Sequence, residues 1–303
     1  MIEKLRQIEG LVSGHTGNRM IVVAAHDENV LSAVKDVYEK KYLDLILIGD
    51  KEKILQIADK IALDVSRINI IKELDAAENA RIAVNLVKSG EGEILMKGLI
   101  QTADFMRAVM EKDKGLRTNR LISHVEIVEP STYPKLLLIS DAGINIAPDL
   151  KQKADIIRNA VDVAHKLGIT QPKVAVLSAI ESVNPDIEST IDASALSKMA
   201  QRGQITGCLV DGPLSMDLAI SMEAVRQKGV ISEVAGDADI LIPPEINTAN
   251  ILLKSLVFLG NNESCSVLTG TRVPLVVTSR ADSSKTKYYS ILLALAMSIY
   301  RGE

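Results

Sequence analysis

The hydrophobic positions of this chain fall into short β-branched runs, each followed by a longer stretch with helical spacing. Alternation of this kind is typical of βαβ units around a mostly parallel sheet. Thr102 is the predicted N-cap of the helix that reaches residue 112. Over the first part of the chain, the predicted strands are residues 20–26, 43–50, 68–73 and 93–98, and the helices after them reach residues 42, 62, 90 and 112.

The alternation breaks near residue 118. Two strand-like runs follow, separated by "PSTYP", which indicates a hairpin or corner rather than a crossover. We therefore place a domain boundary just before them. Beyond the two strands (120–129 and 135–143), we predict helices at 149–167, from about 189, at 215–229, at 247–260 and at the C-terminus, and strands at 173–179, 205–212, 238–244 and 273–277.

The loops that follow strands carry the functional predictions, because ligands of open α/β sheets bind where strand carboxyl ends and helix N-termini converge. In "TSRADSS", residues 278–284, hydroxyls and backbone N–H groups would face an anion. Arg280 adds a fork that can bind a phosphate bidentately. The alternative carries equal weight: Ser283 or Ser284 merely caps the last helix, and Arg280 is a surface arginine.

Other loops after strands offer polar candidates. In "SDAGINIAPDL", Gly143 permits close approach of a ligand, while Asp141 and Asn145 either bind that ligand or bond their own backbone in a turn. Asp211, before a Gly-Pro turn, either orients a ligand or caps. Lys97 either meets an anionic substrate or stays solvated. The remaining candidates for substrate binding are Thr102, Arg107, Asn247 and Thr278.

Composition and charge exclude several classes of protein. The net charge is -4 and the chain has no Trp and two Phe, so neither a basic field nor stacking platforms favour nucleic acid. The first ten residues lack an apolar core, so we expect no signal peptide. The longest apolar run, residues 291–297, is far below the roughly 20 residues of a membrane span. Two cysteines outside any CxxC spacing suit a reducing cytoplasm.

Motifs for other chemistries are missing from the sequence. There is no G-x-x-x-x-G-K-[ST], no G-x-G-x-x-G after a strand and no G-x-S-x-G. The four histidines are dispersed, so we expect no metal site. We expect Cys208 and Cys265 to be buried and inert. Without a covalent nucleophile, direct transfer between two bound substrates is the economical mechanism.

Several loops, taken together and in order, resemble one family, the phosphate acetyl/butyryltransferases, over residues 20 to 300. Its butyryl branch is the nearer one, through "LRTNRLISHV", "NIAPDL" and "TSRADS". The resemblance implies an α/β protein of the isocitrate/isopropylmalate dehydrogenase-like fold, with mostly parallel sheets, helices on both faces and a cleft between two domains. It also implies that residues 118–266 are inserted into a first domain of residues 1–117 plus 267–303. The motifs are "MKGLIQTADFMRAV", "GLRTNRLISHV", "SDAGINIAPDL", "GPLSMDLAIS", "GDADILIPPEINTANILLKSL" and "VPLVVTSRADS".

The activity implied by this resemblance is acyl-CoA + phosphate ⇌ acyl phosphate + CoA, with butyryl as the first choice of acyl group and acetyl as the alternative. Coenzyme A and inorganic phosphate would be substrates, with no tightly bound cofactor and no metal. A homodimer or higher homo-oligomer, a cytoplasmic location and an acyl (butyrate) kinase as functional partner are also implied. An NAD(P)-dependent oxidoreductase of the same fold superfamily and a non-catalytic acyl-CoA or phosphate sensor are the competing hypotheses.

The resemblance also implies roles for single residues. Arg280 would hold phosphate and the charge of the transition state, Ser279 would bond the thioester or the departing sulfur, and Arg107 would bind phosphate or the CoA diphosphate. The chemistry fits these roles, because inorganic phosphate needs positioning more than activation, whereas the oxyanion on the thioester carbonyl needs cations or N–H donors.

One departure from the family concerns the base. The acetyl branch has a catalytic acid about a helical turn and a half after its Ser-Arg pair, but here the only acid in that stretch is Asp282. Asp282 takes the role, or another carboxylate such as Asp141 does, or phosphate dianion attacks unaided. Lys285 and Lys287 are predicted to be surface charges or contacts to CoA phosphates.

Overall fold

The computed structural model describes residues 2–279 and 282–299, which form two compact units. Unit 1 comprises Met1–Leu5 and Leu121–Ser264, and unit 2 comprises Arg6–Arg120 and Cys265–Glu303. These bounds are close to residues 118 and 267, although the segment up to Leu5 groups with unit 1. The predicted domains themselves stay a prediction. Among the helices that the structure describes, none is long and apolar enough to span a membrane.

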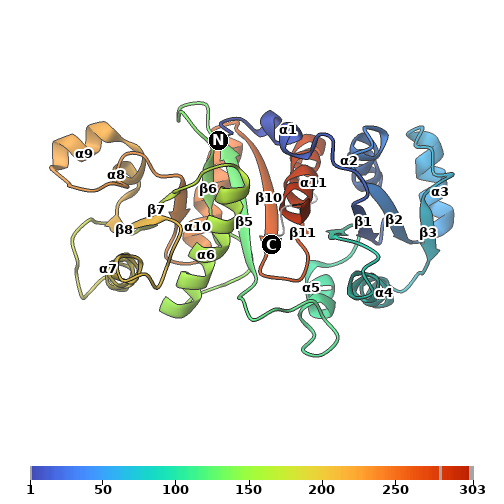
Figure 1. Cartoon of the computed structure of the whole chain (residues 1–303), viewed down its shortest axis with the longest axis horizontal. Helices are drawn as coiled ribbons and strands as arrows, with labels where there is room; N and C mark the ends of the chain where they lie inside the picture. Colours follow the sequence, from blue (N-terminus) through green and yellow to red (C-terminus); the bar gives the residue numbers. More distant parts are fainter. Residues whose placement is uncertain (1, 280–281, 300–303) are drawn as a thin grey trace. The chain divides into compact units, whose positions relative to one another are not determined.

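Unit 2 is built on strands in the order β3-β2-β1-β4-β11-β10. All neighbours are parallel except β10 and β11. Helices cover both faces of this sheet: α1 and α2 pack on α11, and α4 packs on α5 (Figure 1). The elements are α1 (Ile8–Val12), β1 (Arg19–Val23), α2 (Glu28–Glu39), β2 (Asp44–Gly49), α3 (Lys51–Lys60), β3 (Asn69–Lys72), α4 (Ala76–Lys88), β4 (Ile94–Lys97), α5 (Thr102–Met110), β10 (Glu263–Thr269), β11 (Leu275–Val276) and α11 (Ser284–Ile299).

Unit 1 has strands in the order β5-β6-β9-β7-β8. β5 and β6 form the antiparallel pair predicted around "PSTYP", and β6, β9, β7 and β8 run parallel. One apolar cluster joins α8, α9 and α10 to the sheet, while α6 packs on α7. The elements are β5 (Ser123–Glu129), β6 (Leu137–Ile139), α6 (Leu150–Lys166), β7 (Lys173–Leu177), α7 (Glu188–Gln201), β8 (Leu209–Leu214), α8 (Met216–Ile220), α9 (Met222–Lys228), β9 (Ile240–Ile242), α10 (Ile246–Lys254) and η2 (Ser255–Leu259). A short 3₁₀ turn, η1 (Leu5–Gln7), precedes α1.

Aspartates mark the start of several helices. The side chains of Asp27, Asp50 and Asp75 each accept a backbone N–H from the first turn of the following helix. Asp149 forms a reciprocal capping box with Gln152. Each such bond satisfies a helical donor that would otherwise lack a partner.

Three local predictions were wrong. The N-cap of α5 is Gln101, and Thr102 is the first helical residue. The predicted helix 215–229 is two helices, broken at Ser221, whose φ of -123° and ψ of 109° are extended. Residues 263–269, for which no element was predicted, form β10. Ser264 and Ser266 are buried there as deeply as Cys265 and Val267, so burial does not alternate along this strand.

Candidate anion site at the carboxyl edge of unit 2

A small cavity of about 100 Å³ lies in unit 2. It forms at the carboxyl ends of β1, β4 and β11, which are neighbours and run parallel, so their following loops meet at one edge of the sheet. Its lining combines carboxylate, hydroxyl and ammonium groups. The lining residues are Asp27, Asn29, Val30, Lys97, Gly98, Leu99, Thr278, Ser279 and Lys287.

The loops after β1 and β4 approach closely because residue 98 is glycine. The backbone N–H of Gly98 donates to the carbonyl of Val23 at 2.8 Å, and that of Leu99 donates to Ala24 at 2.8 Å. A Cβ at position 98 would lie 2.4 Å from the Ala24 oxygen and 2.5 Å from the Val23 oxygen. Both contacts are with backbone, so any larger residue would have to push the two loops apart.

Lys97 is the last residue of β4 and lines this cavity, as a substrate-binding residue at a strand end should. Its side chain is almost fully buried, and its Nζ donates to the carbonyls of Ile100 at 3.0 Å and Gly98 at 3.2 Å. The solvated alternative for Lys97 is therefore wrong. Its contact with substrate stays a prediction.

Thr278 and Ser279 also line the cavity, just after β11. The backbone N–H of Ser279 donates to Oδ2 of Asp282 at 2.7 Å, and the N–H of Asp282 donates back to the Ser279 carbonyl at 3.2 Å. Two hydrogen bonds thus join Asp282 to Ser279, and the Asp282 carboxylate is not among the groups that line the cavity. Arg280 lies outside the described residues.

Ser283 performs the capping role that the sequence allowed for it. Its Oγ accepts the backbone N–H of Thr286 at 3.0 Å in the first turn of α11. Lys285 is exposed and does not line the cavity, with its Nζ 6.0 Å from the ring centroid of Tyr289.

Lys287 is not a surface charge. It is 3% exposed, it lines the cavity, and its Nζ donates to the backbone carbonyl of Asp282. Burial lowers the pKa of Lys287, an effect that the nearby carboxylates of Asp282 and Asp27 oppose. The sequence pattern carries little signal for this burial, because α11 is apolar on nearly every side and its polar positions do not mark a solvent face.

Two predicted residues of α5 do not reach the cavity. Thr102 is exposed at the start of the helix. Arg107 is exposed as well, and its Nη1 pairs with Oδ1 of Asp104 at 2.6 Å. Their contact with substrate stays a prediction.

In unit 1, Asp141 and Asn145 bond each other. Oδ1 of Asp141 accepts the backbone N–H groups of Gly143 at 2.8 Å and Ile144 at 3.0 Å. Its Oδ2 accepts the side-chain amide of Asn145 at 2.6 Å, and that amide also donates to the carbonyl of Ile122 at 2.9 Å. The carboxylate therefore organises its own loop, which is the turn alternative.

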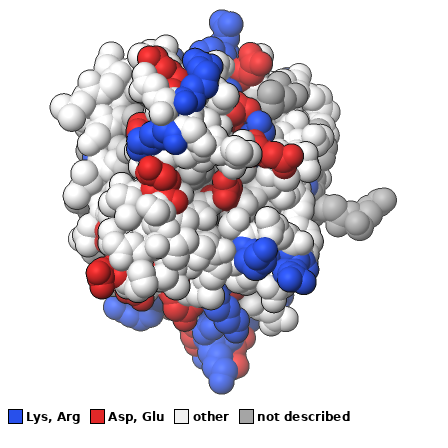
Figure 2. Space-filling model, turned by 90° about the vertical axis from the view of Figure 1, so that its left-hand side faces the viewer, with Lys and Arg blue, Asp and Glu red and all other residues white. Residues whose placement is uncertain are grey.

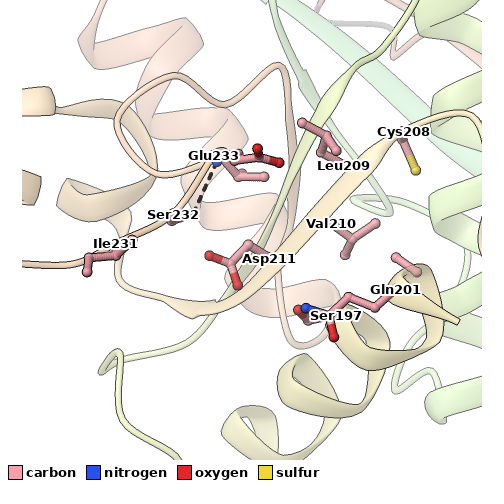
Figure 3. A pocket seen from close by; sticks show the side chains of 11 residues that line it. Ser197, Gln201, Cys208, Leu209, Val210, Asp211, Ile231, Ser232 and Glu233 are labelled. Carbon is pink, nitrogen blue, oxygen red and sulfur yellow. Dashed lines mark hydrogen bonds between the residues drawn. The ribbon is translucent and has the colours of Figure 1, made fainter.

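Asp211 lies within β8, not at its end, and its Oδ1 accepts the N–H of Gly212 at 2.8 Å. It lines a larger cavity of about 500 Å³ with Cys208 and Glu233, and Figure 3 shows it on β8 opposite the segment of residues 231–233. Burial raises the pKa of the Cys208 thiol to about 11, which keeps it protonated and a poor nucleophile. Cys265 is buried in β10.

A second carboxyl edge, in unit 1, carries an apolar cavity of about 350 Å³, and Met216, Pro244 and Thr248 of the quoted motifs are among its lining residues. Its residues follow β7, β8 and β9 or belong to α7 and α10. Asn247 is exposed in the first turn of α10, where its N–H donates to Glu245, and does not line the cavity. The lining residues are Leu177, Ser178, Ala179, Ser189, Met216, Pro244, Thr248 and Leu252.

The charges on the surface are mixed. On the face shown in Figure 2, Lys and Arg are interspersed with Asp and Glu, with uncharged stretches between them. Such a surface offers no large single-sign field of the kind that attracts nucleic acid. Within residues 2–279 and 282–299, no group of three or more His, Cys, Asp or Glu could hold a metal ion.

Two α/β units with cavities at the carboxyl ends of parallel strands define the class of α/β enzyme that binds its ligands at strand ends. The model of the family described as phosphate acetyl/butaryl transferase matches residues 75–295. The chain therefore belongs to this family of acyltransferases, which use CoA and phosphate as substrates.

Individual relatives agree with this assignment. The chain is 45% identical over 294 residues to a phosphate butyryltransferase of Clostridium acetobutylicum, covering 97% of this chain and 98% of that protein. It is 45% identical over 278 residues to a phosphate acetyltransferase of Thermotoga maritima, covering 92% and 94%. The crystal structure of a branched-chain phosphotransacylase from Enterococcus faecalis V583 superposes with a TM-score of 0.82 at 33% identity, covering 93% and 99%. The predicted fold class and family are confirmed.

Proposed function

We propose that this protein transfers a short-chain acyl group, butyryl in the first place, between CoA and inorganic phosphate in a ternary complex. The observation that carries the proposal is the 45% identity with a phosphate butyryltransferase along nearly the whole chain. The cationic cavity at the carboxyl edge of unit 2 supports it.

In this reaction a phosphate oxygen forms a bond to the thioester carbonyl carbon, and the carbon–sulfur bond breaks to release CoA thiolate. Phosphate is already anionic, so the protein has to position it and stabilise the oxyanion that develops on the carbonyl. We assign Arg280 to phosphate and to the charge of the transition state. Ser279, which lines the cavity, bonds the thioester or the departing sulfur.

We further propose that phosphate dianion attacks without a protein base. Asp282 already accepts the N–H of Ser279, and both oxygens of Asp141 are engaged by their own loop. Each such bond takes one of the roughly four lone-pair sites of a carboxylate, so fewer sites remain for a proton from a substrate. Thiolate is a good leaving group, which removes the need for a strong acid as well.

Acetyl transfer is the second candidate. The equal identity to the Thermotoga maritima phosphate acetyltransferase favours it. A series of kcat/KM values over acetyl-, propionyl-, butyryl-, isobutyryl- and valeryl-CoA separates the two, because one methylene in an apolar pocket changes kcat/KM roughly 10–200-fold.

The same proposal covers the cofactor, the oligomeric state, the cellular location and the partner enzyme. No cofactor is bound tightly, the enzyme is a homodimer or higher homo-oligomer in the cytoplasm, and an acyl (butyrate) kinase uses the acyl phosphate. Sedimentation velocity measures the oligomeric state directly.

The decisive experiment measures free thiol released from butyryl-CoA with and without phosphate, and acyl phosphate by ³¹P NMR. We expect release that depends on phosphate and matches the acyl phosphate formed. The absence of phosphate-dependent release with every short acyl-CoA in the series would overturn the proposal. Titration with NAD and NADP tests the oxidoreductase alternative.

A further inference from the structure

The cavity in unit 2 holds a buried lysine whose charge the surrounding protein does not neutralise by an ion pair. Lys287 is 3% exposed, and within the part of the chain that the structure describes no carboxylate forms an ion pair with its Nζ. Moving an ammonium out of water is costly unless an opposite charge or hydrogen bonds replace the lost hydration.

The hydrogen bonds of Lys287 leave room for a ligand. Its Nζ donates to one described group, the backbone carbonyl of Asp282, whereas an ammonium has three N–H donors. Because Lys287 lines the cavity, the remaining donors are placed at its wall.

The neighbours of Lys287 favour an oxyanion. Lys97 is a second buried ammonium at this wall, and Thr278 and Ser279 add hydroxyl groups. Two carboxylates, those of Asp27 and Asp282, lie near Lys287. Asp27 accepts the backbone N–H of Val30, and Asp282 accepts that of Ser279. A bound anion would therefore meet two ammonium groups and two hydroxyls, and it would share the cavity with the carboxylate of Asp27, of which one oxygen accepts the Val30 N–H.

The size of the cavity also fits. At about 100 Å³ it has room for a group the size of one tetrahedral oxyanion.

We propose that Lys287 binds an oxygen of a phosphate group in this cavity, together with Lys97 and the hydroxyl of Thr278. This inference rests on the proposed function, in which phosphate chemistry comes from two sources, inorganic phosphate and the phosphoryl groups of CoA. Because Lys287 also donates to the Asp282 carbonyl, the same side chain links the bound phosphate to Asp282, which accepts the N–H of Ser279.

The test compares Lys287→Met and Lys287→Arg with the matched control Lys285→Met, two positions earlier on the same helix and exposed. For Lys287→Met we expect the KM for phosphate to rise at least about tenfold, as losing a hydrogen bond between charged groups does. Lys287→Arg, which keeps the charge, restores most of the affinity, and Lys285→Met leaves it unchanged. Thermal unfolding verifies that each variant folds, and Lys287→Gln replaces Lys287→Met if that variant does not.

The KM values for phosphate and for acyl-CoA identify the source of the phosphate group that Lys287 binds. A raised KM for phosphate with an unchanged KM for acyl-CoA assigns Lys287 to inorganic phosphate. A raised KM for acyl-CoA, lost when a phosphate-free pantetheine thioester is the donor, assigns it to CoA. If a folded variant without the charge changes neither KM, the inference is overturned.

Failure of the proposed function is a separate result. It would appear as wild-type protein without phosphate-dependent thiol release. Calorimetric titration of inorganic phosphate into wild type and Lys287→Met, without acyl-CoA, then tests the cavity on its own. Equal affinity of the two proteins for phosphate, or no binding by either, counts against Lys287.

Discussion

The two carboxyl-edge cavities occupy the same place in their sheets and have opposite chemistry. In unit 2 the loops after β1, β4 and β11 line about 100 Å³ with ammonium, carboxylate and hydroxyl groups. In unit 1 the loops after β7, β8 and β9 line about 350 Å³ mostly with apolar side chains such as Met216 and Leu252. Parallel topology sets the position of a ligand site, but the residues at the strand ends decide what binds there.

The largest effect on this difference between the cavities is expected from removing Arg280, the strongest predicted cation of unit 2. Arg280→Ala should lower kcat by about 10²–10³, the usual cost of losing one group that stabilises an oxyanion. Arg272→Ala, an exposed arginine shortly before β11, is the control and should leave kcat unchanged. Thiol release under saturating substrates measures both. A kcat for Arg280→Ala close to that of wild type would favour the hypothesis of a non-catalytic acyl-CoA or phosphate sensor.

The close approach of loops in unit 2 predicts a large structural effect at Gly98. Gly98→Ala should lower the free energy of unfolding by about 1–3 kcal/mol, because its Cβ meets two backbone oxygens that cannot move independently. In unit 1, a Cβ on Gly143 would lie 3.6 Å from the His124 ring, an ordinary contact, so Gly143→Ala should change stability by no more than about 0.5 kcal/mol. Urea unfolding of both variants gives the difference, and equal losses would contradict the prediction.

The difference in chemistry predicts a division of labour between the cavities. If the apolar cavity of unit 1 holds the acyl chain, Met216→Ala, which enlarges this cavity, should raise kcat/KM for valeryl-CoA over butyryl-CoA several-fold, since each extra methylene gains apolar contact. Its KM for phosphate should stay that of wild type. Lys97→Met should do the reverse, raising the KM for phosphate without changing chain preference. Measuring kcat/KM for the two acyl-CoAs and KM for phosphate with both variants decides this.

The smallest expected effect is a pH dependence confined to unit 2. Hydrogen bonds from Lys40 and then Tyr288 hold the pKa of Glu9 below its usual value of 4.5, and they tie α1 to α2 and α11. A depressed carboxyl pKa stabilises the folded state above about pH 4.5, and this contribution is lost as the pH falls through the folded-state pKa. Glu9 is partly exposed, so screening limits the contribution to a few tenths of a kcal/mol.

Glu9→Gln should therefore lower the unfolding midpoint slightly at pH 7 and not at pH 3. The control is Glu28→Gln, which breaks the exposed ion pair with Lys60. Thermal melts at both pH values measure the effect. A loss for Glu9→Gln that is as large at pH 3 as at pH 7 would show that packing, not charge, holds α1 in place.

Much of the fold could be predicted from the sequence because its determinants are local. The β-branched runs and helical spacings located most strands and helices, and the N-cap aspartates, such as Asp75 and Asp149, fixed where two helices begin. Failures came where burial overrode the local pattern. Buried Ser264 and Ser266 concealed β10, and a single extended residue, Ser221, divided a continuous helical pattern.

For the candidate site, the sequence determined which loops follow strands and which polar residues they carry. Lys97, Thr278 and Ser279 line one cavity at such an edge, and their contact with substrate stays a prediction. Only the tertiary structure decided how those polar groups are used. Asp141 and Asn145 satisfy each other because their loop folds back on itself, and Lys287 reaches the cavity because α11 is buried between other elements of unit 2. Loop position follows from local backbone order, whereas the burial and partners of a side chain depend on contacts between segments that are distant in the sequence.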